Sequence, residues 1–207
     1  MKKMMYLAAV ALTLAACSPK KTTVKGEFSP EASPAKIRIT VGDKSDISVP
    51  VENGKFEAKV AVDPTVLGRI QAGFANFTFI SDGSTLTVKP EEGKVVSNKK
   101  GGLQSSYNKY NEWLDGFIQD YLIKIRELGE DTEEGKAYYA ECKKEHDEYL
   151  TKTIKANKDN ILAVVALSTL DDEHPAEKLA LIKSLSSKIQ EVPEVAKTKA
   201  ALEAALQ

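Results

Sequence analysis

The sequence predicts an α+β fold in which an amino-terminal antiparallel β-meander or sandwich precedes a carboxyl-terminal, all-helical array. Two hydrophobic periods carry this prediction. Apolar residues alternate with polar ones up to about Val96, and they recur at helical spacing from Leu103 onward. The pair Gly101-Gly102 lies between the two patterns and marks the boundary. Strands and helices that occupy separate stretches of a chain are typical of α+β proteins.

The first residues predict export. Lysines at positions 2 and 3 precede an apolar stretch, residues 4–16, that is interrupted only by Thr13. A transmembrane helix needs ~20 apolar residues, so this stretch is too short to span a bilayer and is typical of a secretory signal peptide. It ends in Leu14-Ala15-Ala16-Cys17, which follows the lipobox pattern of bacterial lipoproteins. We therefore expect residues 1–16 to be removed as a signal peptide.

Cys17 is the predicted lipidation site. Diacylglycerol and further acyl chains such as palmitate would anchor the chain there, because each buried methylene contributes about 0.8 kcal/mol. A thioether-linked Cys17 can neither join a disulfide nor bind a metal. Residues 17–23 are predicted to form a lipidated tether. Ser18, rather than an aspartate, follows the cysteine, which predicts the outer membrane, and the absence of an acidic run there favours its periplasmic face. The alternative is an ordinary cleaved signal in which Cys17 is incidental.

Residues 24–97 predict an antiparallel β domain built from short strands. Residues 37–41 and 47–51 alternate between apolar and polar side chains, and Pro50 implies an edge position or a bulge. Asn53-Gly54 is the strongest hairpin signal, because a type I′ turn needs positive φ at both central residues. Further strands are predicted over residues 56–62, 67–74, 77–80 and 86–88.

Residues 103–207 predict the helical region. The first helix begins at Leu103 and ends at Gly129, with one apolar stripe that includes Ile118. The second covers about residues 133–157 and is expected to turn Tyr139 inward along with other aromatic and apolar side chains.

Three further helices follow. Residues 161–170 are almost entirely apolar, so this third helix is expected to be the most buried. Pro175 suits the first position of a fourth helix that continues to about Ile189. The fifth is expected to begin at Pro193 or Glu194 and to continue to Leu206.

Composition and missing motifs argue against several classes of function. The chain carries 29 Lys and Arg against 30 Asp and Glu, and its basic residues do not cluster with aromatic ones, so we expect no nucleic-acid partner. The sequence lacks a Cys-x-x-Cys pair, a glycine-rich phosphate loop, a Gly-x-Ser-x-Gly motif and a His-Glu-x-x-His motif. We therefore predict a protein that is not an enzyme and has no catalytic residues, metal site or cofactor.

Two aromatic residues of the first helix are candidates for facing a ligand. Tyr110 and Trp113 belong to a series of aromatic side chains, and aromatic residues at helical spacing are typical of a core. Trp113 lies beside the main stripe, so its exposure would favour a ligand groove over a purely structural role.

Cys142 and His146 lie one helical turn apart and are a candidate reactive pair. This spacing can place an imidazole beside a thiol or two ligands on one metal. A small buried side chain at Cys142 is the favoured interpretation, and a reactive thiol and a metal ligand are the alternatives. The acidic run at residues 171–174 (DDEH) is interpreted as capping the next helix rather than as a metal cluster.

Four segments carry a resemblance to a known family. Residues 24–26 (VKG), 51–60 (VENGKFEAKV), 105–111 (SSYNKYN) and 156–167 (ANKDNILAVVAL) follow its pattern. The chain resembles the lipoprotein domain of unknown function 4369. In relatives this amino-terminal module precedes a thioredoxin-like thiol–disulfide oxidoreductase domain, and we expect that domain to be absent because the sequence ends at Gln207. The resemblance implies a fold and a cellular address but no activity.

These observations predict a lipid-anchored lipoprotein of the cell envelope. We expect a monomer that contacts the membrane through the lipid on Cys17 and acts as a non-catalytic binding or interaction module. The sequence does not identify its partner, for which a periplasmic protein is one candidate. The alternative is an accessory role in thiol–disulfide redox chemistry. That role would be exercised through Cys142 or by docking a separate thioredoxin-like protein.

Overall fold

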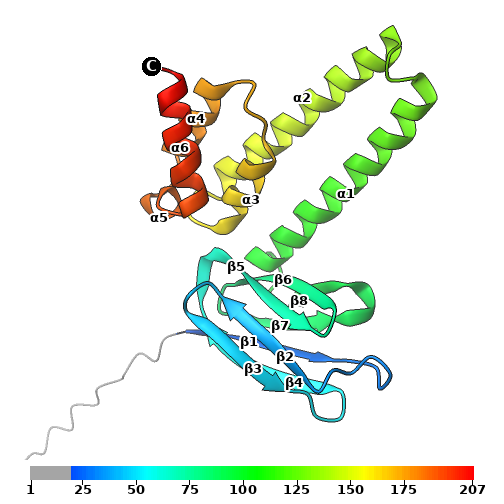
Figure 1. Cartoon of the computed structure of the whole chain (residues 1–207), viewed down its shortest axis with the longest axis vertical. Coiled ribbons are helices and arrows are strands. Elements are labelled where there is room, and N and C mark those ends of the chain that lie inside the picture. Colours follow the sequence, from blue (N-terminus) through cyan, green and yellow to red (C-terminus); the bar gives the residue numbers. More distant parts are fainter. Residues whose placement is uncertain (1–19) are drawn as a thin grey trace, which may run out of the picture.

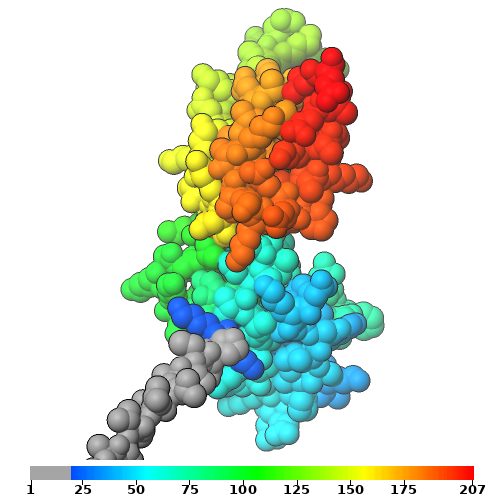
Figure 2. Space-filling view, turned by 90° about the vertical axis from the view of Figure 1, so that its left-hand side faces the viewer, coloured from blue at the N-terminus to red at the C-terminus, as the bar shows by residue number. Residues whose placement is uncertain are grey.

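The computed structural model describes residues 20–207, so the predicted signal peptide and Cys17 lie outside the described residues. Within the described range, eight strands precede six helices, which confirms the predicted α+β class (Figure 1). The helices stand on one end of the β sandwich, and the amino-terminal end of the first strand lies at the waist between the two parts (Figure 2).

The strands form two four-stranded sheets whose inner faces share one apolar core. One sheet has the order β4-β1-β7-β8 and the other the order β3-β2-β5-β6. The strand bounds are β1 (Lys21–Glu27), β2 (Lys36–Val41), β3 (Ser45–Pro50), β4 (Lys55–Ala61), β5 (Asp63–Ala72), β6 (Ala75–Ser81), β7 (Thr85–Lys89) and β8 (Lys94–Ser97), with a 3₁₀ turn, η1 (Pro90–Glu92), before the last.

The expectation of a purely antiparallel domain is wrong for one pair of strands. β1 and β7 run parallel, with Val24 opposite Leu86, whereas the other pairs are antiparallel. A tight turn forces neighbouring strands to be antiparallel, but the chain between β1 and β7 forms the whole second sheet, so their direction is free of that constraint. The tether is also shorter than predicted, because Lys21–Thr23 belong to β1.

The turn at Asn53-Gly54 forms as predicted but joins two sheets rather than two paired strands. Both residues have positive φ, 50° and 78°. Glu52 and Lys55 exchange backbone hydrogen bonds of 2.9 Å, and then β3 pairs with β2 while β4 pairs with β1. Pro50 ends β3 at an edge of its sheet, where a missing N–H does no harm.

The strand predicted over residues 67–74 is displaced toward the amino terminus. β5 ends at Ala72, and Gly73 adopts a positive φ of 60° in a tight turn. Phe74 therefore lies fully exposed on the β5–β6 turn instead of inside a strand.

The helices are α1 (Leu103–Leu128), α2 (Glu133–Ala156), α3 (Ile161–Thr169), α4 (Pro175–Lys183), α5 (Ser187–Gln190) and α6 (Pro193–Ala205). Six of the nine residues of α3 are buried, as its apolar sequence predicts. The predicted fourth helix is instead split into α4 and α5. The backbone N–H of Ser186 donates to the carbonyl of Lys158 at 2.9 Å, so the chain leaves the helical path there.

Gln104 joins the helices to both sheets. Its side chain is fully buried, at 0% exposure. Its Oε1 accepts from the Ile80 backbone N–H at 2.8 Å, and its Nε2 donates to the Val95 carbonyl at 3.2 Å and to Asn108 Oδ1 at 2.8 Å. Ile80 is in β6 and Val95 in β8, which are edge strands of different sheets. Gln104 therefore closes one open side of the sandwich and sets the position of α1.

We expect Gln104→Ala to lower the free energy of unfolding by about 1–3 kcal/mol, because it leaves the buried Ile80 N–H without its acceptor. The Val95 carbonyl keeps its second donor, Asn108 Nδ2, at 2.8 Å. Urea denaturation followed by circular dichroism measures this loss. Gln119→Ala is the matched control, since Gln119 is an exposed residue of the same helix. Equal stability of the two variants would contradict the role assigned to Gln104.

Candidate functional site

The α1–α2 hairpin extends beyond the rest of the molecule (Figure 1). α1 has 26 residues and α2 has 24, whereas α3, which packs against them, has nine. At 1.5 Å per residue, α1 is about 39 Å long and α3 only about 14 Å. α3 can therefore cover only the part of the hairpin nearest the β sandwich.

The tip of the hairpin is a tight turn. Thr132 caps α2 by accepting a hydrogen bond from the Gly135 N–H at 3.0 Å. Gly135 lies so close to the preceding loop that a Cβ there would be 2.0 Å from the Gly129 carbonyl oxygen. Only glycine fits this position, and Gly129 itself ends α1 as the sequence predicts.

Stacked aromatic rings hold the two helices of the hairpin together. The ring centroids of Trp113 and Tyr149 lie 3.6 Å apart, and Phe117 stacks on His146 at 5.5 Å. Nearer the tip, the centroids of Tyr121 and Tyr138 are 6.2 Å apart. We call these rings, with Tyr110 and Tyr139, the aromatic ladder.

Tyr110 and Trp113 both belong to this ladder. Tyr110 is buried, and its hydroxyl forms a 3.0 Å hydrogen bond with Thr169 at the end of α3. Burial raises the pKa of Tyr110. Trp113 is half-buried between Phe117 and Tyr149. Neither residue lines the pocket described next, so both serve to position the hairpin.

A pocket of about 280 Å³ opens between the two hairpin helices above the end of α3. Cys142 and His146 both line it, so the structure brings the predicted pair to one place. Cys142 is only 7% exposed and is a free cysteine. The other lining residues are Phe117, Tyr121, Tyr139, Lys143, Asp147, Thr169 and Asp171.

Two neighbours modify the chemistry of this pocket. Contact with the Cys142 side chain raises the pKa of Tyr138 to about 12. The imidazole of His146 lies 3.4 Å from the carboxylate of Asp147, measured from Nδ1 to Oδ1. No hydrogen bond joins Cys142 to His146 within residues 20–207.

One lysine of the pocket, Lys143, forms ion pairs with three carboxylates. Lys143 Nζ lies 3.0 Å from Asp147 and 3.3 Å from Glu173, and it also pairs with Asp171. These hydrogen bonds, the one to Asp171 above all, raise the pKa of Lys143 and lower that of Asp171. The site keeps an excess of negative charge, because three carboxylates share one ammonium group.

The acidic run at residues 171–174 does not cap α4 with a side chain as predicted. The N-cap residue is His174, whose side chain makes no capping hydrogen bond. Asp171 and Glu173 pair with Lys143, and Asp172 lies 2.7 Å from the buried Lys178. These carboxylates therefore form ion pairs with basic side chains of α2 and α4 instead of accepting hydrogen bonds from the first backbone N–H groups of α4. Among the described residues, no group of three or more His, Cys, Asp or Glu side chains is placed to hold a metal ion.

Apolar side chains of the hairpin lie exposed above the pocket. Ile118 is 44% exposed and Leu122 is 50% exposed. The helical periodicity predicts that Ile118 belongs to the inward stripe and that Tyr139 faces inward, whereas both side chains are exposed. Both expectations fail because α3 is too short to reach them. The difference in helix length was visible in the sequence and indicates that part of the hairpin stays uncovered, but it does not indicate which residues.

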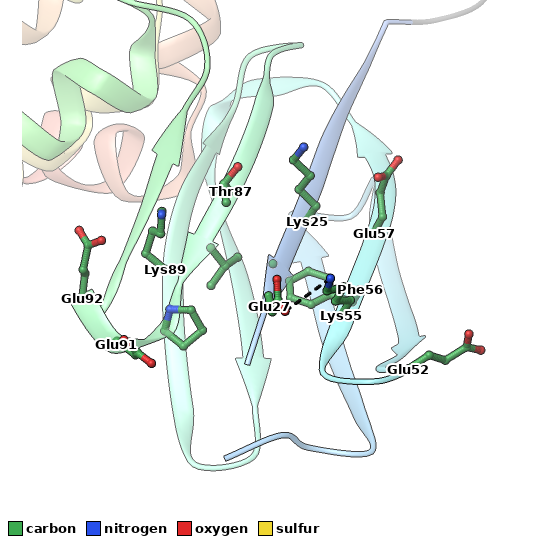
Figure 3. Close-up of a pocket in the computed structure, with 13 residues that line it drawn as sticks. Lys25, Glu27, Glu52, Lys55, Phe56, Glu57, Thr87, Lys89, Glu91 and Glu92 are labelled. Atoms are coloured by element: carbon green, nitrogen blue, oxygen red, sulfur yellow. Dashed lines mark ion pairs between the residues drawn. The ribbon is translucent and has the colours of Figure 1, made fainter. Parts of the chain in front are cut away.

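A larger hollow of about 740 Å³ lies on the outer face of sheet β4-β1-β7-β8 (Figure 3). Exposed lysines and glutamates of both signs line it, among them Lys25, Glu57 and Lys89. Lys55 and Glu27 form a 3.5 Å ion pair there. This mixture of charges is typical of a solvated sheet face, so the hairpin pocket is the stronger candidate.

Comparisons with protein families, with curated proteins and with solved structures return no match for this chain. The resemblance to the lipoprotein domain of unknown function 4369 therefore stays a prediction. In residues 20–207, none of the helices combines the length and the apolar character needed to cross a bilayer.

We expect Lys143→Met to destabilise the fold modestly, by less than about 1 kcal/mol, because the ion pairs are partly exposed. The depressed pKa of Asp171 makes its contribution present above the ordinary value of 3.8 and lost as the pH falls through the lower, folded-state pKa. The difference between wild type and variant should therefore be present at neutral pH and shrink in acid. Urea denaturation over a pH series measures it.

Lys144→Met is the control for that series, since Lys144 is exposed and lies 4.0 Å from Glu148. A pH-independent difference for Lys143→Met would show that its methylene stem, rather than its charge, contributes the stability.

Proposed function

We propose that this protein is a lipid-anchored, non-catalytic interaction module of the cell envelope, and that its α1–α2 hairpin binds a partner in the periplasm. One observation carries the binding role. Ile118 and Leu122, the sequence neighbours of the pocket-lining Phe117 and Tyr121, remain exposed on a hairpin that extends past its own core. Exposed apolar surface of this kind is a common mark of an interaction site.

The lipid anchor rests on the sequence. Three residues, 18–20, separate Cys17 from Lys21, where β1 begins. The four steps from one Cα to the next reach at most about 14 Å when the chain is fully extended. The waist at which β1 begins would then lie close to the membrane surface, and the hairpin tip lies far from the start of β1 (Figure 1). This arrangement would hold the hairpin away from the lipid and available to a partner.

The polar groups of the pocket are already engaged by contacts within the protein, which favours a binding role over a catalytic one. Lys143 is engaged by three carboxylates, and His146 is stacked against Phe117 and lies beside Asp147. Cys142 is packed at the base with little exposure. A nucleophile needs an adjacent base and access to its substrate, and these contacts favour neither.

Cells fed an alkyne analogue of palmitate should label the wild-type protein, and Cys17→Ser should abolish the label and release the protein from the membrane fraction. The physical reason is that acylation at Cys17 is the proposed membrane attachment. In-gel fluorescence after azide coupling measures the label. Cys142→Ser is the control and should label normally. Unchanged labelling of Cys17→Ser would contradict the anchor.

A photo-crosslinking side chain at position 122 tests the binding role in intact envelopes. We expect a discrete crosslinked species from position 122 and none from position 123. Ile123 is 60% exposed, but it lies about 100° around α1 from Leu122, on the side opposite Leu114. Equal crosslinking at the two positions would mean that exposure alone, not a specific surface, decides capture.

The redox alternative is favoured by one observation, the presence of Cys142 and His146 in the same pocket. If Cys142 is structural, native protein should react with iodoacetamide much more slowly than urea-unfolded protein, because the thiol is almost buried. Mass spectrometry over time measures the rates. Rapid alkylation of the native thiol would favour a direct redox role.

A further inference from the structure

We propose that the upper part of the α1–α2 hairpin docks a basic amphipathic helix of a partner protein. This helix would continue the line of α3 along the surface formed by Leu114, Ile118 and Leu122 of α1 and by Tyr139 of α2, which we call the groove. This inference rests on the proposed binding function and names the chemistry of the partner. It is carried by the course of the groove, by its length and by its charge.

The groove continues a surface that is already used for helix packing. On α2, the fully buried Leu150 and Ile154 belong to the helical core beside α3. On α1, Leu114 packs against that same core. Ile118 and Leu122 follow Leu114 at intervals of four residues, so they lie on the same side of α1. The side of α1 that faces the core therefore runs on beyond α3 as an uncovered strip.

The uncovered part has the dimensions of a helix-binding site. From Leu114 to the end of α1 at Leu128, the helix rises by about 21 Å, or about four turns. The exposed Tyr139 of α2 and the half-buried Tyr121 of α1 both line the hairpin pocket, with their ring centroids 6.3 Å apart. An amphipathic helix binds such a groove through apolar anchors spaced three and four residues apart.

The charge of the hairpin selects a basic partner. Residues 115–148 contain eleven Asp and Glu side chains against five Lys and Arg, whereas the whole chain is nearly neutral. At the lower end of the groove, Asp147, Asp171 and Glu173 share the single ammonium of Lys143. A Lys or Arg from a partner would complete these ion pairs and could also lie over the face of Tyr139.

The same charge disfavours a second copy of this chain as the occupant. A second hairpin would bring its own excess of carboxylates to the contact, and like charges brought together oppose association. A basic helix from a different protein is attracted by the negative charge of the hairpin, whereas a second hairpin is repelled by it.

Synthetic peptides of about 20 residues, long enough to form a helix on binding, test the proposal. The basic peptide contains Leu at intervals of three and four with Lys elsewhere. One control replaces every Lys with Glu, and another keeps the composition but scatters the Leu residues. Titration calorimetry with the lipid-free chain that starts at Ser18, which keeps every residue of both cores, measures binding. Fluorescence of Trp113, the single tryptophan, gives a second readout.

We expect the basic patterned peptide to bind, and Leu122→Ser to weaken it by roughly tenfold or more, which corresponds to about 1.4 kcal/mol. Ile123→Ser should leave binding unchanged. Glu173→Lys should weaken binding, and Glu141→Lys, an equal charge change at an exposed residue outside the pocket, should weaken it less. Circular dichroism of each variant confirms that it is folded.

Three results would overturn the proposal: no binding of the basic peptide, equal binding of the acidic one, or equal effects of Leu122→Ser and Ile123→Ser. Failure of the partner chemistry is distinguishable from failure of the binding function. If position 122 still crosslinks selectively in envelopes while the basic peptide does not bind, the groove is an interaction site for a different class of partner. Self-association that Leu122→Ser abolishes would assign the groove to a second copy.

Discussion

The relation between the two halves of this protein depends on the hydrogen bonds of one buried amide. Gln104 spans the edge strands β6 and β8, which belong to different sheets, and it lies in the first turn of α1. Asp82 supports this junction by accepting a hydrogen bond from the Leu103 N–H at 3.2 Å. An unpaired edge invites association with other chains. Here a side chain of α1 forms hydrogen bonds with backbone groups of both edge strands. The same contacts therefore cover these edges and fix the direction in which the hairpin extends.

From that junction the hairpin extends past the point where its own core can support it. The buried helical cluster ends near Tyr110 and Leu150, and beyond these residues the aromatic ladder alone connects α1 to α2. Stacked rings bury a large area with few rotatable bonds, so they can hold two helices together without a third layer. The consequence is an apolar surface that the rest of the molecule leaves uncovered, which is the physical basis of the proposed interaction role.

Exposed apolar side chains distinguish the two large surfaces of the molecule. On the outer face of sheet β4-β1-β7-β8, three lysines and five glutamates line the hollow. On the hairpin, carboxylates also outnumber basic groups, and Lys143 is shared by three of them, but here Ile118 and Leu122 are exposed as well. Negative charge together with exposed apolar side chains favours a partner that is both basic and apolar.

The sequence by itself determined the class of fold and most of its elements, because period-two and period-3.6 patterns follow directly from backbone geometry. It placed α1, the buried α3 and the turn at Asn53-Gly54, and it singled out Cys142 and His146, which line one pocket. Only the tertiary structure decided that this turn crosses between sheets, that β1 and β7 are parallel, and that Ile118 and Tyr139 are exposed. These outcomes depend on which distant strands pair and on how far α3 reaches along its neighbours, and such long-range contacts leave no local pattern in the chain.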